Sequence, residues 1–280
     1  MQLKHSNGFR GMLLGVVVGV ALQLIGYLIA RDDRSDFGLV MFIVVPFVSG
    51  FAVAAVTSAV VAGRGRIIAC CLAGCIITFT ILLFTGWEGI ICCFMAAPLV
   101  GIGLLLGALL GCQVRRRFIE KASNPRTLGI ISVLLCPLFI AGANRIEQPF
   151  RTIQEREVFA SEILLPVLSE RAWELVAAMD RLDGPRPFLL RAGLPVPNRC
   201  ELRSSSVGGE RVCYFDQGAI EQEVTTWQHP SKMAFRVTGN TLPGRRWLTF
   251  IDADYEFASV DGGTRVVRHT TIGTRLYPRW

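Results

Sequence analysis

The polar side chains that could do chemistry lie near the C-terminal end of the sequence. His269 carries an imidazole, a group that can act as a general acid or base, and Arg268 and Tyr255 could bind or protonate a substrate beside it. These three residues are the catalytic candidates. The sequence shows no nucleophile or carboxylate partner for His269, so an ordinary strand histidine is the alternative interpretation.

Three carboxylates, Asp252, Asp254 and Glu256, alternate along one expected strand and could form a pair for general acid/base catalysis. A strand sends successive side chains to opposite faces, and the residues between these carboxylates are apolar. A solvated outer face is therefore the alternative interpretation.

The nine cysteines do not form a metal-binding pattern. Seven lie inside apolar runs, where cysteine behaves as a small hydrophobic residue, and no C-x-x-C motif occurs. We expect neither a metal nor a cofactor. Cys200 and Cys213 differ, because they flank a turn and adjacent strands could bring them together as a disulfide. Two free thiols are the alternative, since the register of the strands is unknown.

Apolar residues alternate along three expected strands and could line the face of a sheet. Such a face is typical of a pocket for an apolar small molecule or lipid, and packing against a covering element is the alternative. The predicted ligand-binding residues are Val224, Thr226, Met233, Phe235, Val237, Ile251, Ala253, Tyr255 and Phe257.

These residues belong to residues 147–280, where short alternating runs and turn sequences predict a mixed α+β domain with an antiparallel sheet. Ser169 is expected to cap a helix that reaches Met179. The expected strands cover residues 158–165, 200–204, 210–215, 219–227, 232–238, 248–259 and 264–274.

Residues 1–146 have a different composition and predict a multi-pass helical membrane bundle. The whole chain of 280 residues is 51% hydrophobic and only 18% charged, which excludes a disordered chain and an ordinary soluble protein. Long uncharged runs are expected to cross the bilayer as helices. The predicted spans are residues 11–30, 39–62, 67–85, 90–114 and 128–143, of which the last is short and has a re-entrant segment as its alternative.

The net charge of +7 lies in this apolar half. Residues 1–144 contain 11 Lys and Arg against 5 Asp and Glu, and the remainder contains 18 against 17, so no basic patch for nucleic acid is expected. Nine Lys and Arg would lie on the side of the N-terminus and five on the other, which predicts a cytoplasmic N-terminus. Five spans put the C-terminal domain outside the cytoplasm, and four keep it in the cytosol.

Two of the predicted spans carry glycine at every fourth position, a pattern that lets helices approach closely. The glycines are Gly11, Gly15 and Gly19 in the first span and Gly103, Gly107 and Gly111 in the fourth. We expect these two spans to pair, within the chain or across a homo-oligomer. No predicted span contains an ionisable residue other than cysteine, which argues against an ion-coupled transporter.

Residues 155–280 resemble the SRPBCC superfamily, the START/Bet v 1-like helix-grip proteins, and within it the polyketide cyclase/dehydrase-like group. The matching sequences are REVFASEILLP, ERAWELV, PNRCELRSSSVGGERVCYF, DQGAIEQEV, HPSKMAFRVTG, DGGTRVVRHTT and TRLYPRW. The N-terminal half is similar to the multi-span regions attached to some bacterial members. The resemblance implies a curved sheet around a long C-terminal helix with an apolar cavity between them. That helix is expected to be missing, because this sequence stops at Trp280, either as a truncated chain or with another element covering the sheet.

Three functions remain open from the sequence. The first is a membrane-bound domain that binds or senses an apolar small molecule or lipid at the bilayer surface. The resemblance also allows a polyketide cyclase or dehydratase-like enzyme. The third is a structural membrane protein whose soluble domain binds a protein partner.

Overall fold

The computed structural model describes residues 2–30, 38–57, 63–119, 121, 124–151, 155–179, 188–191, 193–245 and 247–274. The chain forms two compact units. One consists mainly of the helices up to Ile153, and the other mainly of the segment Gln154–Arg275.

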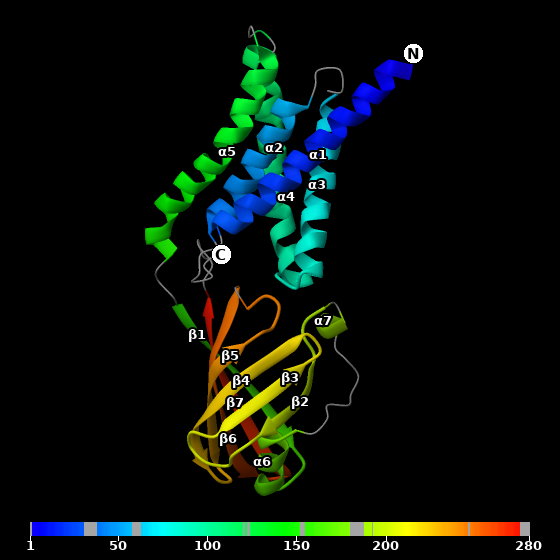
Figure 1. Cartoon of the computed structure of the whole chain (residues 1–280). Coiled ribbons are helices and arrows are strands. Elements are labelled where there is room, and N and C mark those ends of the chain that lie inside the picture. Colours follow the sequence, from blue (N-terminus) through cyan, green and yellow to red (C-terminus); the bar gives the residue numbers. More distant parts are fainter. Residues whose placement is uncertain are drawn as a thin grey trace. The chain divides into compact units, whose positions relative to one another are not determined.

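The helical unit is built from five apolar segments that alternate in direction (Figure 1). Their bounds are α1 (Gln2–Ala30), η1 with α2 (Val40–Val44 and Val45–Val56), α3 (Arg64–Phe84), α4 with η2 (Ile90–Val114 and Arg115–Ile119), and α5 (Pro125–Glu147), after which η3 (Gln148–Arg151) makes one short turn. Because α1 and α3 run in the same direction, the chain returns between them through α2.

Four of these segments are long and apolar enough to cross a bilayer: Phe9–Ala30, Gly65–Phe84, Ile90–Ile119 and Gly129–Phe150. The helix over Val40–Val56 is apolar but shorter, although a longer span was expected for residues 39–62. The last segment is longer than the 16 residues expected, because α5 continues through Pro137 to Glu147. A proline is tolerated inside such a helix where neighbours compensate for the lost hydrogen bond.

The core of the helical unit is centred on α2. Val45, Val48 and Ala52 are buried against Leu22 of α1 and Ile140 of α5. Large apolar side chains point outwards on α1, α3, α4 and α5, among them Phe94 at 73% exposure and Leu138 at 69%. Such exposure is costly in water and normal in lipid.

The second unit is one antiparallel sheet of seven strands in the order β1-β7-β6-β5-β4-β3-β2. The strands are β1 (Glu155–Leu165), β2 (Pro197–Leu202), β3 (Glu210–Phe215), β4 (Gly218–Gln228), β5 (Lys232–Asn240), β6 (Leu248–Val260) and β7 (Gly263–Thr274). Two short helices, α6 (Ser169–Ala177) and α7 (Phe188–Arg191), lie between β1 and β2 in the sequence. The expected fold class, a helical bundle followed by an α+β unit, is confirmed.

Helix α6 begins at Ser169, but not through the expected side-chain cap. The Ser169 hydroxyl lies 2.8 Å from the hydroxyl of Ser259 on β6, and the residue before the helix, Leu168, makes no side-chain cap either. The helix ends at Ala177, because Met179 forms a β-bridge with Cys200 of β2. Ser169 therefore attaches the start of α6 to the sheet.

Candidate binding face of the sheet

We call the sheet face that contacts α6 the inner face, and the opposite face the outer face. The α6 helix packs through Ala172, Trp173 and Ala177 on a floor of buried strand residues. The Trp173 ring makes edge contacts with Trp227 of β4, with ring centroids 4.9 Å apart. The floor consists of Val224, Met233, Phe235, Phe257 and Val266.

Most of the predicted ligand-binding residues lie on this inner face. Val224 pairs with Phe235, Phe235 with Ala253, and Ala253 with Thr270 of β7. Val224, Met233 and Phe235 are fully buried. The buried members of this set are already in contact with α6 or each other, so a ligand could reach the face only through the partly exposed members.

The prediction for Thr226 is wrong. A β-bulge between Val224 and Thr226 adds one residue to β4, so Thr226 pairs with Ala234 of the outer face and Trp227 pairs with Met233 of the inner face. A bulge shifts the alternation of side chains by one position. Trp227, which the sequence analysis missed, occupies the inner position instead.

Ile251 is misplaced for the same reason. A bulge between Phe250 and Asp252 puts Phe250 opposite Ile272, which belongs to the inner face. Ile251 lies within the bulge, so the alternation that assigned it to the inner face does not reach it.

The structure separates the three catalytic candidates. His269 lies on the outer face, where its Nδ1 is 3.1 Å from Oδ2 of Asp254 on the neighbouring strand. Arg268 and Tyr255 form the adjacent cross-strand pair on the inner face, with the Arg268 guanidinium carbon 5.5 Å from the centre of the Tyr255 ring. His269 therefore cannot share one substrate with Arg268 and Tyr255.

The three alternating carboxylates lie on the solvated outer face, opposite the apolar one. Glu256 accepts a hydrogen bond of 2.8 Å from Lys232 across the β5–β6 pair. This hydrogen bond and the lysine charge lower the pKa of Glu256. Within the described residues no group of three or more His, Cys, Asp or Glu side chains could hold a metal ion.

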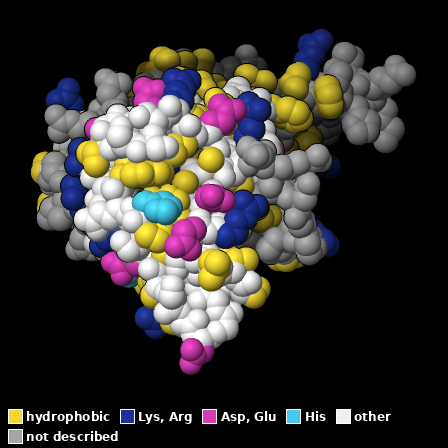
Figure 2. Space-filling model, turned by 90° about the horizontal axis from the view of Figure 1, so that it is seen from below, with side chains coloured by type: hydrophobic (Ala, Val, Ile, Leu, Met, Phe, Trp, Pro, Cys, Tyr) yellow, Lys and Arg dark blue, Asp and Glu magenta, His cyan; other side chains and the backbone are white. Residues whose placement is uncertain are grey.

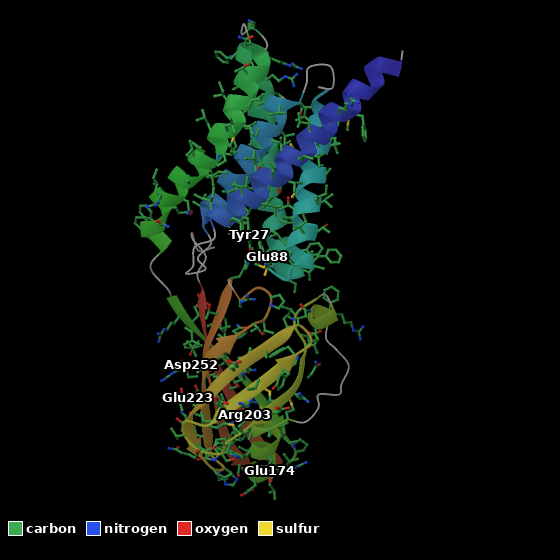
Figure 3. All side chains as sticks on the ribbon, viewed as in Figure 1. Tyr27, Glu88, Glu174, Arg203, Glu223 and Asp252 are labelled. Atoms are coloured by element: carbon green, nitrogen blue, oxygen red, sulfur yellow. A yellow bond between two sulfur atoms is a disulfide. The ribbon has the colours of Figure 1, made fainter. Side chains whose placement is uncertain are left out.

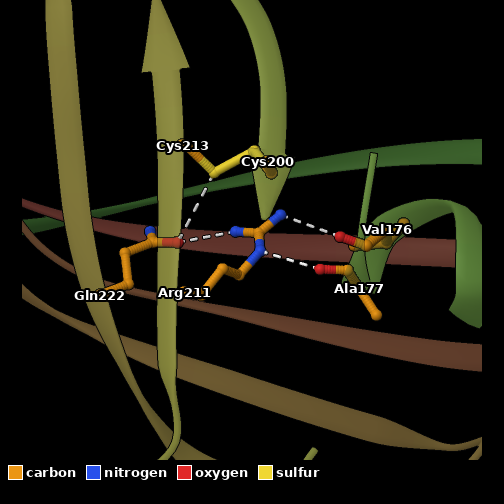
Figure 4. Close-up of a disulfide and its surroundings, with 6 residues drawn as sticks. All are labelled: Val176, Ala177, Cys200, Arg211, Cys213 and Gln222. Atoms are coloured by element: carbon orange, nitrogen blue, oxygen red, sulfur yellow. Dashed lines mark hydrogen bonds between the residues drawn. A yellow bond between two sulfur atoms is a disulfide. The ribbon is translucent and has the colours of Figure 1, made fainter. Parts of the chain in front are cut away.

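Arg211 of β3 is a buried residue that the sequence analysis missed. Its Nε and Nη2 donate to the carbonyl oxygens of Ala177 and Val176 at 3.1 and 2.9 Å, and Nη1 donates to Oε1 of Gln222 at 2.6 Å (Figure 4). The side chain thus caps the C-terminus of α6, where the helix dipole favours a cation. Burial lowers the pKa of Arg211, and the nearby Arg268 charge acts in the same direction.

Cys200 and Cys213 lie opposite each other in the register of β2 and β3. Their Cα atoms are 4.0 Å apart, and the structure joins their sulfur atoms as a disulfide (Figure 4). The bond links the edge strand to the sheet next to Arg211. The other seven cysteines lie in the helical unit and form no disulfide among the described residues.

The inner face continues past α6 to the edge strand β1, where it is open among the described residues. Phe159 pairs with Thr270, and Ile163 pairs with the buried Val266. These two apolar side chains are nevertheless 54% and 56% exposed. In the view from below, the hydrophobic side chains of the described residues are interspersed with charged ones (Figure 2). Among the described residues, the most exposed apolar side chains of the inner face are therefore on β1.

In the helical unit, the glycine pattern of α4 meets α2 rather than α1. A Cβ atom on Gly107 would overlap the backbone carbonyl of Phe47, and one on Gly111 would lie 2.7 Å from the carbonyl oxygen of Phe51. Gly103 lies against Ile43 in the same way. Gly15 and Gly19 of α1 face Val53 of α2. The expected pairing of the first and fourth spans is corrected, because α2 contacts both glycine patterns.

Charged side chains satisfy both ends of this central helix. The Glu147 carboxylate of α5 accepts from the Val40 backbone N–H, with oxygens at 3.2 and 3.4 Å. At the other end Arg115 of η2 donates to the carbonyl oxygens of Ala54, at 3.4 Å, and Thr57. Glu147 and Arg115 are buried at 7% and 5% exposure. The helical unit therefore contains two buried charged residues, which lie just beyond the predicted spans 90–114 and 128–143.

A second polar contact joins α1 to the turn between α3 and α4. The Tyr27 hydroxyl donates to Oε1 of Glu88 at 2.7 Å in a buried position (Figure 3). The Tyr27 ring also stacks on Trp87, with centroids 5.8 Å apart. Tyr27 thus links α1 to this turn through both a hydrogen bond and a ring contact.

No protein-family model and no curated protein matches the chain. Several solved structures resemble it over less than half of its length. A putative uncharacterized protein from Rhizobium leguminosarum is 15% identical, with a TM-score of 0.32, and the match covers 44% of this chain and 80% of that one. Ara h 8.0201 is 14% identical, with a TM-score of 0.33, and the match covers 43% of this chain and 80% of that one. The protein of unknown function SA2116 from Staphylococcus aureus is 14% identical, with a TM-score of 0.31, and the match covers 45% of this chain and 75% of that one. Similarity at this level carries no functional conclusion.

Proposed function

We propose that this chain is an integral membrane protein whose sheet unit binds an apolar small molecule or lipid on its inner face. The observation that carries the proposal is the apolar surface beside β1. Phe159 and Ile163 are more than half exposed, although they continue the same face as the buried floor. Exposed apolar surface next to a hydrophobic core is typical of a site that another apolar group covers.

The helical unit supports the membrane part of the proposal. Four helices have the length and composition of membrane spans, and several of their largest apolar side chains point outwards. We place the membrane domain at residues 1–146 and the binding domain at residues 147–280. The binding face would then be tethered to a bilayer, where apolar ligands are abundant.

We further propose that the N-terminus is cytoplasmic and the binding domain extracytoplasmic. The five helical segments alternate in direction, and nine Lys and Arg then lie at the N-terminal side against five at the other. Positive charge is retained on the cytoplasmic side of membrane proteins. The disulfide between Cys200 and Cys213 supports the same side, because such bonds persist in oxidising compartments.

Two adjacent residues of β1 allow a matched test of the binding face. Ile163 on the inner face and Leu164 on the outer face have 56% and 55% exposure. We expect the purified full-length protein to retain an apolar molecule, detected by native mass spectrometry and by lipid extraction. The Ile163→Glu variant should lose it, and the Leu164→Glu variant should keep it. An empty wild-type protein that is indifferent to added lipid would refute the proposal.

The other two functions receive less support. A polyketide cyclase or dehydratase-like activity would depend on Tyr255 and Arg268 alone, since His269 lies on the outer face. Assembly of a homo-oligomer through the glycine patterns would have to use surfaces other than those that α2 already occupies. We therefore keep apolar ligand binding as the proposed function.

A further inference from the structure

Two arginines and two aromatic rings form a row on the inner face. The Arg211 guanidinium carbon lies 4.5 Å from the centre of the Phe235 ring, and that ring meets Tyr255 edge to face at 6.2 Å. Arg268 lies at the other end of the row, with its guanidinium carbon 5.5 Å from the centre of the Tyr255 ring. Two positive charges thus lie on the face to which we assign an apolar ligand.

Neither positive charge is neutralised by a carboxylate in the described part of the chain. The hydrogen-bond acceptors of Arg211 are two backbone carbonyls and the Gln222 amide, all uncharged. They take up three of the five N–H groups that a guanidinium offers. Arg211 is only 5% exposed, so water compensates its charge poorly.

Arg268 is exposed and contacts the Tyr255 ring without forming an ion pair among the described residues. By register the nearest acidic strand residue on the same face is Glu157, which pairs with Ile272, whereas Arg268 pairs with Tyr255 and Ser161. Glu157 lies four residues before Ser161 on β1, which corresponds to roughly 13 Å along a strand. The Arg268 guanidinium is therefore available to an anion that enters the inner face.

We propose, building on the proposed function, that the inner face selects an apolar molecule carrying one carboxylate, such as a long-chain fatty acid. The carboxylate pairs with Arg268 beside Tyr255, and the hydrocarbon chain lies along Phe159 and Ile163. Arg211 contributes a second positive charge to this part of the face from beneath α6.

The contacts favour one carboxylate over other head groups. A guanidinium binds the two oxygens of a carboxylate side by side through its planar fork. Among the described strand residues the exposed cation on this face is Arg268, while Arg211 is held in place by α6. One available guanidinium matches a group of charge −1, and the surrounding apolar surface disfavours a more strongly charged head.

The test compares two probes that share one hydrocarbon chain. Oleic acid and oleyl alcohol are titrated into the full-length protein in a neutral detergent, with binding followed by native mass spectrometry. We expect oleic acid to bind more tightly. The Arg268→Gln substitution should lower the affinity for oleic acid by about 10-fold, as expected for a lost charge-assisted hydrogen bond. It should leave the affinity for oleyl alcohol unchanged. The Arg265→Gln variant, on the same strand and the outer face, should change neither.

The outcomes distinguish the two proposals. Equal affinity for both probes, or no effect of Arg268→Gln, would overturn the carboxylate assignment and leave apolar binding intact. A wild-type protein that binds neither probe would refute the proposed function itself. Tighter binding of oleyl phosphate than oleic acid, with the same dependence on Arg268, would replace the carboxylate by a phosphate head group.

Discussion

Asp254 and His269 face each other across β6 and β7, with 3.1 Å between Oδ2 and Nδ1, on the outer face of the sheet. Their sequence neighbours Tyr255 and Arg268 form the next pair and point to the inner face. Residues that are neighbours in the sequence therefore lie on opposite faces of the sheet, because successive strand residues alternate between faces.

This alternation predicts different effects for two substitutions. His269→Gln should leave the amount of retained apolar molecule unchanged, and Tyr255→Ala should reduce it by removing inner-face surface. Lipid extraction of the full-length variants measures the difference, and circular dichroism checks that both remain folded. Loss of ligand in His269→Gln with retention in Tyr255→Ala would contradict the assignment of the faces.

Arg211→Met should destabilise the sheet unit. The change removes the donors for the carbonyls of Val176 and Ala177, and leaving buried acceptors unpaired costs about 1–3 kcal/mol for each group. The thermal transition, followed by the fluorescence of Trp173 and Trp227, should move to a lower temperature. Arg236→Met, on the exposed outer side of β5, is the control and should leave the transition nearly unchanged.

Gly107→Ala should destabilise the helical unit, because its new methyl group would overlap the Phe47 backbone. Gly101→Ala is the matched control on α4, since its methyl group would meet no atom within 4 Å. Alanine has the higher helix propensity, so Gly101→Ala should be neutral or slightly stabilising. Thermal unfolding in detergent distinguishes the two variants. An equal response would show that α4 does not pack closely on α2.

The proposed topology predicts the behaviour of two thiols in intact cells. Cys200 and Cys213 should resist a membrane-impermeant thiol reagent until a reductant is added, and Cys200→Ser should make Cys213 reactive without reduction. An alkaline phosphatase fused after Trp280 should be active. An inactive fusion would move the binding domain into the cytosol. An active fusion with freely labelled wild-type thiols would keep the topology and remove the disulfide.

The Lys232–Glu256 ion pair predicts a small dependence of stability on pH. The pKa of Glu256 is lowered by Lys232, so the stabilisation is present at neutral pH and disappears as the pH falls through the pKa of the folded state. Both side chains are more than 40% exposed, which limits the effect to less than about 1 kcal/mol. Glu256→Gln should remove this dependence in unfolding titrations between neutral and acidic pH. Glu223→Gln is the control, and an equal loss there would contradict the assignment.

The order of elements could be predicted from the sequence because it depends on local patterns. Uncharged runs predict the helices of the first unit, and alternation with turn residues predicts the strands of the second. The inner face was predicted correctly as far as the strands stay regular, as for Met233 and Phe235. At the bulges near Thr226 and Ile251 an extra residue reverses the alternation, and nothing in the local pattern marks such a residue.

Contacts between distant segments could not be predicted in this way. Arg211 resembles any charged strand residue until α6 is placed beside it, and Arg115 resembles any loop cation until α2 ends beside it. The partner helix of Gly107 is likewise decided by packing of the whole bundle. Glycine spacing marks a surface for close approach without specifying which helix approaches.

The buried charges at the two ends of α2 have a consequence for how the protein is made. The ribosome completes α2 at Val56, but Arg115 and Glu147, which satisfy its ends, are synthesised 59 and 91 residues later. In the proposed membrane location, unpaired backbone groups at these ends would be costly, so we expect α2 to be stable in lipid only once Arg115 and Glu147 have been made. We therefore expect a chain cut before Glu147 to leave the Val40 end of this segment without its partner, even though α1, α3 and α4 are complete.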